Sequence, residues 1–392
     1  MIDQRWVTLA VLFVARSSFG YQFQTVASSA ASIETELQIG YAAIGMLIGL
    51  YTIPGAFLSL PGGVLGARFG DRAIGVAGLV LMIGGGLLMC VGDTVLPLTA
   101  GRLISGAGSV LFGLVLNKML VDWFAGREIV FAMGTLMSSW PFGIALGLIV
   151  QGRIAESLGW RTGMAIAALF CLVALVLIVA VYRAPSGAVA RAAGGGTWWN
   201  PPDWPSLRSV LLADGAWGCF NLALIVLFSF GGSLLAVRGM PAQDAAAVTS
   251  IALWIAILSV PLGGFLLQRT ASPRLWANLS YLAAGLALLA LYLDVWPVVA
   301  CIAFGLALGP GPGALTAMPS RVLRPDHRIT GLAIFGTVNS AIMGIGPIFA
   351  GILADAAQTP AAALLLGVAM AVVCVPLTTL FEATRPKGSA DR

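Results

Sequence analysis

Long apolar runs separated by short polar breaks dominate the pattern of this chain of 392 residues. A helix that spans a bilayer needs about 20 mostly apolar residues, and runs of that length occur twelve times. The breaks are rich in Gly, Pro and charged residues, which are typical of turns between helices. The pattern therefore predicts an all-α membrane protein with twelve transmembrane helices. The runs lie near residues 6–30, 41–63, 72–92, 96–120, 130–151, 162–182, 207–236, 247–268, 275–293, 297–318, 330–354 and 361–381.

The longest polar interruption falls between the sixth and the seventh run. Residues 183–206 read RAPSGAVARAAGGGTWWNPPDWPS, a stretch rich in Gly, Pro and Ala. Such a composition between two periodic segments is typical of a linker. We expect a six-helix half over residues 1–182, a cytoplasmic linker over 183–206 and a second six-helix half over 207–392.

The two halves also repeat short motifs at nearly one offset. GGVLGAR at residues 62–68 follows the second run, and GGFLLQR at 263–269 follows the eighth run, 201 residues later. Gly-Thr followed by polar residues at 134–139 recurs at 336–340, 202 residues later. A six-helix unit duplicated in the same orientation is the architecture of a transporter whose halves are related by an axis along the membrane normal.

Composition supports a membrane protein and removes other classes. The chain is 59% hydrophobic and 9% charged, whereas soluble domains carry about 25% charged residues. The net charge of +5 is not gathered into a basic stripe, so nucleic acid is not an expected partner. The five cysteines lie far apart within apolar runs, which fits packed free thiols rather than a metal site.

Signals for catalysis or processing are missing from the sequence. No Gly-x4-Gly-Lys-Ser/Thr loop is present, so ATP-driven pumping by this chain is not expected. We expect no enzyme activity, no cofactor and no metal. The apolar run after Arg5 resembles a signal peptide, but a signal core has only about 7–15 apolar residues, and this run contains Arg16. We interpret it as a retained first helix.

The basic residues predict the orientation, because cytoplasmic loops retain positive charge. With a cytoplasmic N-terminus, the outside loops hold three basic residues and three more lie within helices. The inside loops and tails then hold 15, and both termini are expected in the cytoplasm. These 15 are Arg5, Arg68, Arg72, Arg127, Arg183, Arg191, Arg208, Arg269, Arg274, Arg321, Arg324, Arg328, Arg385, Lys387 and Arg392.

Arg16 is the sharpest chemical feature of the chain. It lies about 15 Å from the start of the first run, near the middle of a hydrocarbon core about 30 Å thick. Insertion scales place a central arginine at about +2.5–3.5 kcal/mol, so the guanidinium needs compensation. Carbonyls or an acidic neighbour are one source. A planar oxyanion substrate, gripped through two hydrogen bonds, is the source that we favour.

Other polar and aromatic side chains indicate a pocket around Arg16. One helical face beside Arg16 contains Ser17, then Tyr21 four residues later and Gln24 three residues after that. Any one of the remaining candidates alone is explained by packing or an interhelical hydrogen bond, but together they make a plausible substrate site. They lie at middle depths of five other runs: Tyr51, Trp140, Trp217, Asn221, Trp254 and Asn339.

Three further charged residues lie within the runs. Arg102 is expected to hold helices together through buried hydrogen bonds. Lys118 lies near a run end, four residues from Asp122, where a snorkelling side chain with a helix-surface partner is expected. Asp214 is the one acid clearly inside the membrane region. It is either a proton carrier, since desolvation favours its protonated form, or the partner of a basic residue near the cytoplasmic end.

The sequence resembles the major facilitator superfamily over almost its whole length. The loop motif of that family between the second and third helices is matched by Gly63, Arg68 and Gly70, but Ala67 stands where the family usually has Asp. The resemblance implies conformational roles for these residues. In the family, that Asp helps to latch the two halves together on the cytoplasmic side, and Ala67 lacks the carboxylate for this contact. Arg102 with Gly106 and Gly108 is similar to the family motif of the fourth helix, which implies a structural role.

Within the superfamily, two groups are distantly similar. Arg16 and the stretch with Trp217 and Asn221 resemble the cyanate and nitroimidazole transporters. NKMLVDWFAGRE, at the end of the fourth run, resembles the nitrate and nitrite porters. Those porters carry an arginine in the second helix and another in the eighth, whereas neither 41–63 nor 247–268 contains Lys or Arg.

The sequence thus predicts an alternating-access permease of the inner membrane that moves a small organic or inorganic anion. Its expected partners are that anion, the lipid bilayer and, in the case of symport, a proton carried by Asp214. A monomer is expected. Two alternatives stay open: an exporter of hydrophobic drugs, for which the aromatic residues matter most, and a receptor that keeps the fold without transport.

Overall fold

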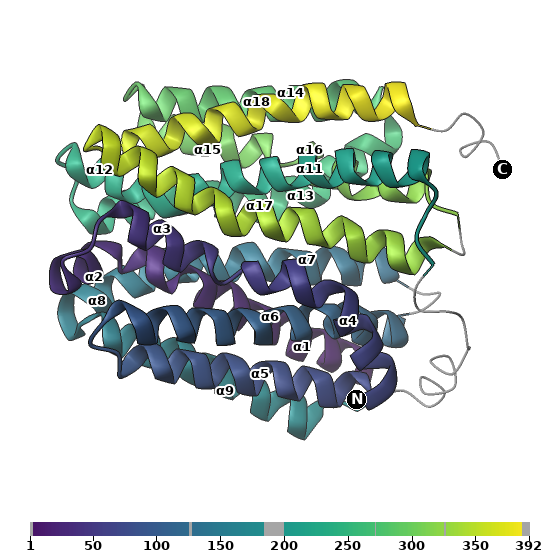
Figure 1. The fold of residues 1–392 in the computed structure, drawn as a ribbon, viewed down its shortest axis with the longest axis horizontal. Helices are drawn as coiled ribbons and strands as arrows, with labels where there is room; N and C mark the ends of the chain where they lie inside the picture. Colours follow the sequence, from purple (N-terminus) through teal and green to yellow (C-terminus); the bar gives the residue numbers. More distant parts are fainter. Residues whose placement is uncertain (1–2, 125–127, 184–199, 271, 325–326, 386–392) are drawn as a thin grey trace. The chain divides into compact units, whose positions relative to one another are not determined.

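A computed structural model of the chain describes residues 3–124, 128–183, 200–270, 272–324 and 327–385 (Figure 1). All regular elements within these ranges are helices. Their contacts divide the chain into two compact units. Unit 1 comprises residues 1–38 and 50–197, and unit 2 comprises residues 39–49 and 198–392.

Unit 1 is built around its first helix. This helix, α1, packs against α6, α7 and α9, while α5 packs against α6 and α9. Its core is apolar, with Leu12, Met82, Phe112 and Met119 fully buried. The helices are α1 (Gln4–Ser28), α2 (Ala30–Leu37), α4 (Ile53–Phe69), α5 (Asp71–Cys90), α6 (Val95–Phe124), α7 (Ile129–Leu146), the π-helical η1 (Gly147–Gln151), α8 (Gly152–Leu158) and α9 (Trp160–Val181).

Unit 2 contains the helices of the second half together with one helix from the first. Helix α11 packs against α17 and α18, and α13 packs against α15 and α16. The helices are α3 (Tyr41–Gly49), α11 (Trp204–Val226), the π-helical η2 (Leu227–Gly231), α12 (Gly232–Val237), α13 (Ala242–Arg269), α14 (Pro273–Tyr292), α15 (Pro297–Ala307), α16 (Pro310–Ala317), the 3-10 helix η3 (Pro319–Arg321), α17 (Arg328–Ala357) and α18 (Ala361–Thr384).

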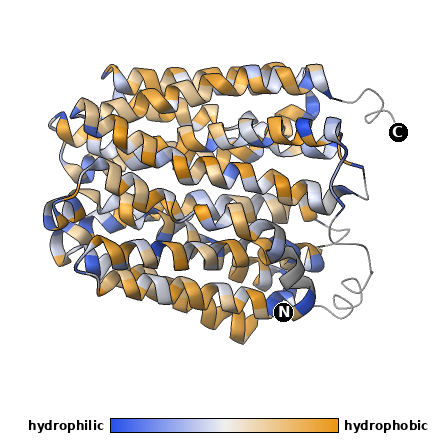
Figure 2. Cartoon of the chain, viewed as in Figure 1, coloured by the Kyte–Doolittle hydropathy of each residue, from blue (hydrophilic) through white to orange (hydrophobic). Residues whose placement is uncertain are grey.

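The described helices account for the twelve expected spans. Eleven helical segments are long and apolar enough to cross a membrane, and their apolar stretches stand out in Figure 2. Helix α1 is the twelfth: its 25 residues reach about 37 Å, but Arg16, Gln22 and Gln24 lower its mean hydropathy. The chain is a multi-pass membrane protein with a twelve-helix architecture.

The second expected span is interrupted. The run over 41–63 was expected to be continuous, but α3 ends at Gly49 and α4 begins at Ile53. Pro54 explains the break, because it has no N–H to donate to the carbonyl of Leu50 and its ring clashes with that carbonyl in a continuous helix. The tenth span is divided in the same way between α15 and α16, where the Gly-Pro pairs of residues 309–313 begin.

Helix α3 is held to α17 by close backbone packing. A side chain at Gly45 would collide with Pro347, and one at Gly49 would collide with Gly344. Both carboxylate oxygens of Asp355 accept backbone N–H groups at the start of α3, from Tyr41 and Ala42, each at 2.8 Å. These contacts explain why residues 39–49 group with unit 2, although they precede the expected boundary between the halves.

Residues 184–199, most of the expected linker, lie outside the described residues, and α11 begins at Trp204, three residues before the expected second half. All five cysteines are free, and four of them are buried. The expectation of packed thiols is confirmed.

Equivalent positions of the repeat make equivalent hydrogen bonds. In α7 the Ser138 hydroxyl donates to the Gly134 carbonyl at 3.0 Å. In α17 the Ser340 hydroxyl donates to the Gly336 carbonyl at 2.7 Å. The two pairs are 202 residues apart, as the repeated motif requires.

Candidate functional site

Arg16 lies near the middle of α1, about 18 Å along the helix axis from Gln4. Its Nη1 donates to Oδ1 of Asn117 in α6 at 3.4 Å. Its Nε is buried and has no hydrogen-bond partner. Within the described part of the chain, no carboxylate lies at ion-pair distance from Arg16. An arginine has five N–H donors, so this guanidinium retains capacity for an acceptor that is not part of unit 1.

The expected polar face of α1 is used for packing. The hydroxyl of Tyr21 donates to Oε1 of Gln151 at 3.0 Å, and the amide of Gln24 donates to the Ser28 hydroxyl at 3.2 Å. Their side of α1 meets α7, where Gly143 and Gly147 let the helices approach closely. Arg16 instead bonds to α6, so the structure does not bring Tyr21 and Gln24 together with its guanidinium.

An aromatic cluster continues along α1 from Arg16. The ring of Phe19 stacks on Tyr51 at 5.9 Å and lies 6.5 Å from Trp140. Phe23, one turn further, contacts the same two rings at 5.7 and 5.9 Å. The indole Nε1 of Trp140 is buried and has no hydrogen-bond partner. Tyr51 and Trp140 are therefore brought together, one to two helical turns beyond Arg16.

Two residues of this region escaped the sequence reasoning. Asn117 is a single amide in an apolar run, next to Lys118, and only the crossing of α6 with α1 gives it a role. Phe19 was not among the candidate residues, yet its ring contacts both Tyr51 and Trp140. The available signal was the helical spacing of Phe19 and Phe23 from Arg16, at three and seven residues.

Arg102 is a second buried arginine of unit 1, and its donors are used. It is fully buried, and its Nη1 and Nη2 donate to the carbonyls of Gln22 and Phe23, each at 3.1 Å. Its guanidinium lies 4.5 Å from the ring centre of Tyr51. These bonds tie α6 to α1, as a structural role would require.

The neighbouring motif glycines allow close helix approach. A side chain at Gly106 would collide with the backbone of Tyr51, and one at Gly108 would collide with Gly78 of α5. Gly70 caps α5 with φ +85°, a conformation that favours glycine. Arg68 is exposed, with its guanidinium 5.5 Å from the ring of Phe69. Gly63 lies in α4, but its surroundings lie outside the described residues.

Lys118 makes an ion pair near a helix end. Its Nζ lies 2.7 Å from Oδ2 of Asp71, the first residue of α5. The side chain remains 43% exposed. The expected snorkelling lysine thus has a partner on the neighbouring helix, and this pair links α6 to α5.

In unit 2, Asp214 lies in α11, about 15 Å along the axis from Trp204. The residue is fully buried. Its Oδ2 accepts the backbone N–H of Val338 in α17 at 2.8 Å, whereas its Oδ1 is buried without a hydrogen-bond partner. No Lys or Arg of the described ranges forms an ion pair with it. The alternative role of Asp214, as the partner of a basic residue, is therefore not supported by the described residues.

Asn221 and Asn339 continue the same contact between α11 and α17. The amide Nδ2 of Asn221 donates to Oδ1 of Asn339 at 2.9 Å. Trp217 lies between Asp214 and Asn221 in sequence, at three and four residues, and stacks on Phe220 at 6.3 Å. Asp214, Asn221 and Asn339 thus lie along the contact between α11 and α17, and we call these three residues the Asp214 cluster. Trp254 lies in α13, which packs against α15 and α16, and is 37% exposed.

Two repeated bundles of membrane-length helices, each with an incompletely paired charged group inside its first helix, define a polytopic membrane transport protein. The family model of the Major Facilitator Superfamily matches residues 12–240 and 234–392. The chain belongs to this superfamily, and the resemblance found in the sequence is confirmed.

Curated relatives carry different descriptions. An MFS-type efflux pump of Mycolicibacterium smegmatis is 29% identical over 368 residues, which cover 87% of this chain and 82% of that protein. A hexuronate transporter of Bacillus subtilis is 22% identical over 60% of this chain and 58% of its own length. A nitrite extrusion protein of Bacillus subtilis is 21% identical over 89% of this chain and 86% of its own length.

A solved structure supports the fold. A mutant of the nucleoside transporter NupG superposes with a TM-score of 0.76 and 14% identity, covering 97% of this chain and 100% of that one. At this identity the likeness shows the fold alone. The membrane-transporter family and its twelve-helix fold are established by these matches, while the substrate has to be argued from the site.

Proposed function

We propose that this transporter moves a small organic or inorganic anion by alternating access, and that Arg16 binds the anion directly. The observation that carries the proposal is the incomplete pairing of Arg16: one long hydrogen bond to Asn117 and a buried Nε without a partner. A bound oxyanion would supply both the missing charge and the missing acceptors. Arginine suits this task, because its planar fork matches a carboxylate or similar oxyanion.

The energetic argument favours a ligand over a purely structural role. A central arginine costs about 2.5–3.5 kcal/mol on insertion scales. Arg102 shows how this chain compensates such a cost with its own carbonyls. Arg16 has no comparable set among the described residues. We infer that an anion provides the compensation during the transport cycle.

Two relatives add support from their descriptions. One is described as a hexuronate transporter and one as a nitrite extrusion protein. Hexuronate and nitrite are both small anions that contain oxygen acceptors. The chemistry proposed for Arg16 suits this class of substrate, without selecting a member of it.

Asp214 is the proposed proton carrier of the same cycle. Its carboxyl is buried in α11 and has one oxygen without a hydrogen-bond partner. Protonation at that oxygen would neutralise the buried charge, while the Val338 contact at the other oxygen persists. Proton–anion symport is therefore the proposed mode of energy coupling.

A second candidate function is the export of hydrophobic compounds. The relative at 29% identity is described as an efflux pump, and the cluster of Phe19, Phe23, Tyr51 and Trp140 offers an aromatic surface. In that case the rings would bind the cargo and Arg16 would contribute little. A receptor that lacks transport is the remaining alternative, and saturable flux in liposomes would dispose of it.

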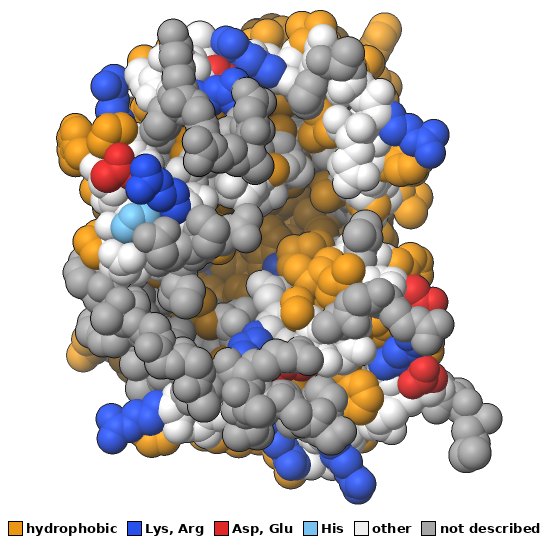
Figure 3. Space-filling view, turned by 90° about the vertical axis from the view of Figure 1, so that its right-hand side faces the viewer, with side chains coloured by type: hydrophobic (Ala, Val, Ile, Leu, Met, Phe, Trp, Pro, Cys, Tyr) orange, Lys and Arg blue, Asp and Glu red, His pale blue; other side chains and the backbone are white. Residues whose placement is uncertain are grey.

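For the location we propose the inner membrane, with both termini in the cytoplasm and a monomer as the working unit. Lys and Arg side chains are visible around the helix ends on the face shown in Figure 3. Positive charge is retained on the cytoplasmic side of bacterial-type membrane proteins. Thiol labelling of single cysteines on opposite loops in intact cells would test this orientation.

The test of substrate class is a thermal-shift panel on purified protein. Small carboxylates and inorganic oxyanions are compared with neutral hydrophobic drugs, on the wild type, Arg16→Gln and Arg208→Gln. The last variant is a matched control, because Arg208 is an exposed arginine of α11. We expect at least one anion to raise the Tm of the wild type and the control but not of Arg16→Gln. Stabilisation by neutral drugs alone, equal in all three proteins, would favour the exporter.

A further inference from the structure

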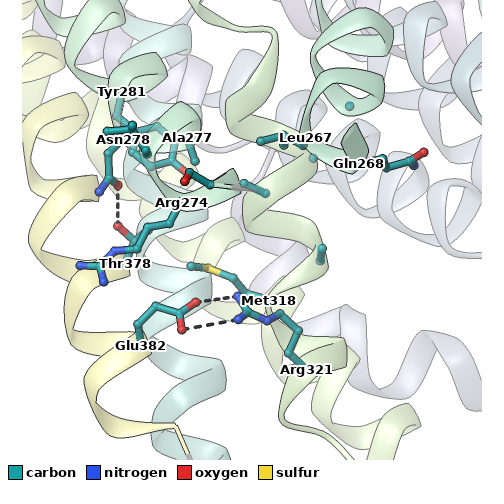
Figure 4. A pocket seen from close by; sticks show the side chains of 16 residues that line it. Leu267, Gln268, Arg274, Ala277, Asn278, Tyr281, Met318, Arg321, Thr378 and Glu382 are labelled. Carbon is teal, nitrogen blue, oxygen red and sulfur yellow. Dashed lines mark hydrogen bonds and ion pairs between the residues drawn. The ribbon is translucent and has the colours of Figure 1, made fainter. Parts of the chain in front are cut away.

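A cavity of about 1000 Å3 lies within unit 2 and shares no residue with the Asp214 cluster. It lies among α13, α14, α16 and α18, close to one end of these helices (Figure 4). Its volume is in the range of binding sites for small molecules, about 300–1,000 Å3. Its polar lining includes Gln268, Arg274, Asn278, Tyr281, Arg321 and Glu382.

Positive charge exceeds negative charge at the outer end of the cavity. Glu382 is shared by two arginines: its Oε1 lies 2.6 Å from Nη1 of Arg321, and its Oε2 lies 3.3 Å from Nε of Arg385. Arg274 donates to the Thr379 hydroxyl at 2.9 Å and forms no ion pair with any described residue. Arg274 lies in the first turn of α14, where the helix dipole adds positive potential. This end of the cavity is suited to an anion.

The inner end of the cavity presents an unused hydroxyl. Tyr281 is fully buried, and its hydroxyl has no hydrogen-bond partner. It lies seven residues from Arg274 in α14, which is about 10 Å along the axis. Asn278, one turn before it, accepts a hydrogen bond from Thr378 at 3.1 Å, as Figure 4 shows. A buried hydroxyl without a partner is unfavourable, so a polar group bound in the cavity would relieve it.

The cavity also borders surface that faces lipid. Leu275 lines the cavity and is 57% exposed. Trp276 and Leu279, which follow it in α14, are also exposed. In a chain that spans the bilayer, such large apolar side chains contact acyl chains. A ligand in this cavity would thus have positively charged side chains, a polar interior group and apolar surroundings within reach.

We propose that this cavity binds the phosphate headgroup of an anionic phospholipid. The phosphate is held by Arg274, an ester oxygen of the glycerol region accepts the hydrogen bond of Tyr281, and the acyl chains leave past Leu275. Arginine and phosphate form charge-assisted hydrogen bonds, and basic pockets between transmembrane helices bind anionic headgroups. The site is separate from Arg16 and does not depend on the identity of the transported substrate.

The experiment measures the Tm of purified, delipidated full-length protein in neutral detergent during titration with three probes. Phosphatidylglycerol supplies an anionic headgroup, phosphatidylcholine supplies a zwitterionic one, and inorganic phosphate supplies the free anion. The variants are Arg274→Gln and Tyr281→Phe. Their matched controls are Arg269→Gln, an exposed arginine of α13, and Tyr292→Phe, at the other end of α14. Neither control residue lines the cavity.

We expect phosphatidylglycerol to stabilise the wild type at a concentration about tenfold lower than phosphatidylcholine. Arg274→Gln should lose this preference, Tyr281→Phe should weaken binding of phosphatidylglycerol, and both controls should behave as the wild type. Tyr281→Phe removes one unpaired hydroxyl and keeps the ring. If Arg274→Gln fails to fold, the affinity of Tyr281→Phe for phosphatidylglycerol still tests the site. If inorganic phosphate raised the Tm as much as phosphatidylglycerol, and this effect needed Arg274, the ligand would be a soluble phosphate instead of a lipid. Equal effects of the two lipids, or equal losses in Arg269→Gln, would overturn the site.

Discussion

The first helices of the two repeats carry opposite charges in similar settings. In unit 1, Arg16 of α1 faces α6 and keeps a buried Nε without a partner. In unit 2, Asp214 of α11 faces α17 and keeps a buried Oδ1 without a partner. With the repeat offset of 201 residues, the position of Arg16 corresponds to Trp217, so the two charges lie about one helical turn apart in the repeat. The repeat therefore preserves the helices and changes the charge that they carry.

The two repeats share an intrahelical serine hydrogen bond in α7 and α17, but they do not share the polar residues of their first helices. The serine hydrogen bonds at Ser138 and Ser340 are equivalent. By contrast, Asp214 and Asn221 have Phe13 and Gly20 at the corresponding positions of α1. A duplicated scaffold with one cation and one carboxyl can divide two tasks: anion binding in one half and proton binding in the other. The predictions below test this division.

The largest effect is expected from Arg102, the arginine of unit 1 whose donors are satisfied. Arg102→Met removes two charge-assisted hydrogen bonds, worth about 1.5–3 kcal/mol each. It also removes the contact with the ring of Tyr51. We expect a much lower Tm and a loss of monodisperse protein on size-exclusion chromatography. Arg16→Met should keep the fold, and if both variants were equally stable the contrast between the two arginines would be wrong.

The next effect concerns Arg16 and transport rather than folding. Arg16→Lys keeps the charge and replaces the planar fork by a point charge. Loss of one charge-assisted hydrogen bond in the bound state should weaken anion affinity about 10- to 100-fold. The Tm without substrate should stay near that of the wild type. Anion uptake into proteoliposomes measures the effect, and full activity of Arg16→Ala would remove Arg16 from the site.

A smaller effect is expected from Asp214. Asp214→Asn keeps an acceptor oxygen for the Val338 N–H and removes the titrating group. If one proton accompanies each anion, a gradient of one pH unit supplies about 1.4 kcal/mol, or about tenfold accumulation. The variant should lose this accumulation and still exchange anions at uniform pH. Accumulation by Asp214→Asn at the wild-type level would show that another group carries the proton or that none does.

The apolar runs predicted the helices well, because length and hydrophobicity decide which segments cross a bilayer. They missed the break between Gly49 and Ile53, since hydrophobicity does not register a lost backbone donor. Pro54 was visible in the sequence, but its effect depends on whether neighbours can compensate for the lost hydrogen bond. The packing of α3 on α17, through Gly49 and Gly344, was not predictable from either segment alone.

The candidate site was predictable only where a residue conflicts with its surroundings. Arg16 and Asp214 stand out as charges in apolar runs. Asn117 does not, because it acquires its role from a helix 101 residues away. The helical-face argument placed Tyr21 and Gln24 beside Arg16, yet that face of α1 packs against α7. Which face of a buried helix meets which neighbour depends on tertiary contacts, and sequence periodicity does not contain them.

The smallest expected effect comes from Arg161, a half-buried arginine of unit 1 whose Nη1 and Nη2 both donate hydrogen bonds. It forms ion pairs with Glu36 and, at 2.9 Å, with Asp93. Glu36 also accepts the indole N–H of Trp160 at 2.7 Å. The hydrogen bond from Arg161, followed by that from Trp160, lowers the pKa of Glu36 below its ordinary value of 4.5. Unlike Arg16, this arginine has carboxylate partners among the described residues.

A carboxyl with a lowered pKa in the folded state stabilises the protein above its ordinary pKa. This contribution is lost as the pH falls from about 4.5 through the lower folded-state pKa. Glu36→Gln should therefore lower the Tm slightly at pH 7, by the small amount typical of exposed pairs. The difference from the wild type should vanish in acid. Thermal unfolding at pH 7, 5 and 3.5 measures it, with Asp203→Asn, an exposed carboxylate before α11 whose side chain makes no capping hydrogen bond, as the control. A difference that grows in acid, or a control that matches Glu36→Gln, would mean that Glu36 is not held by Arg161 and Trp160.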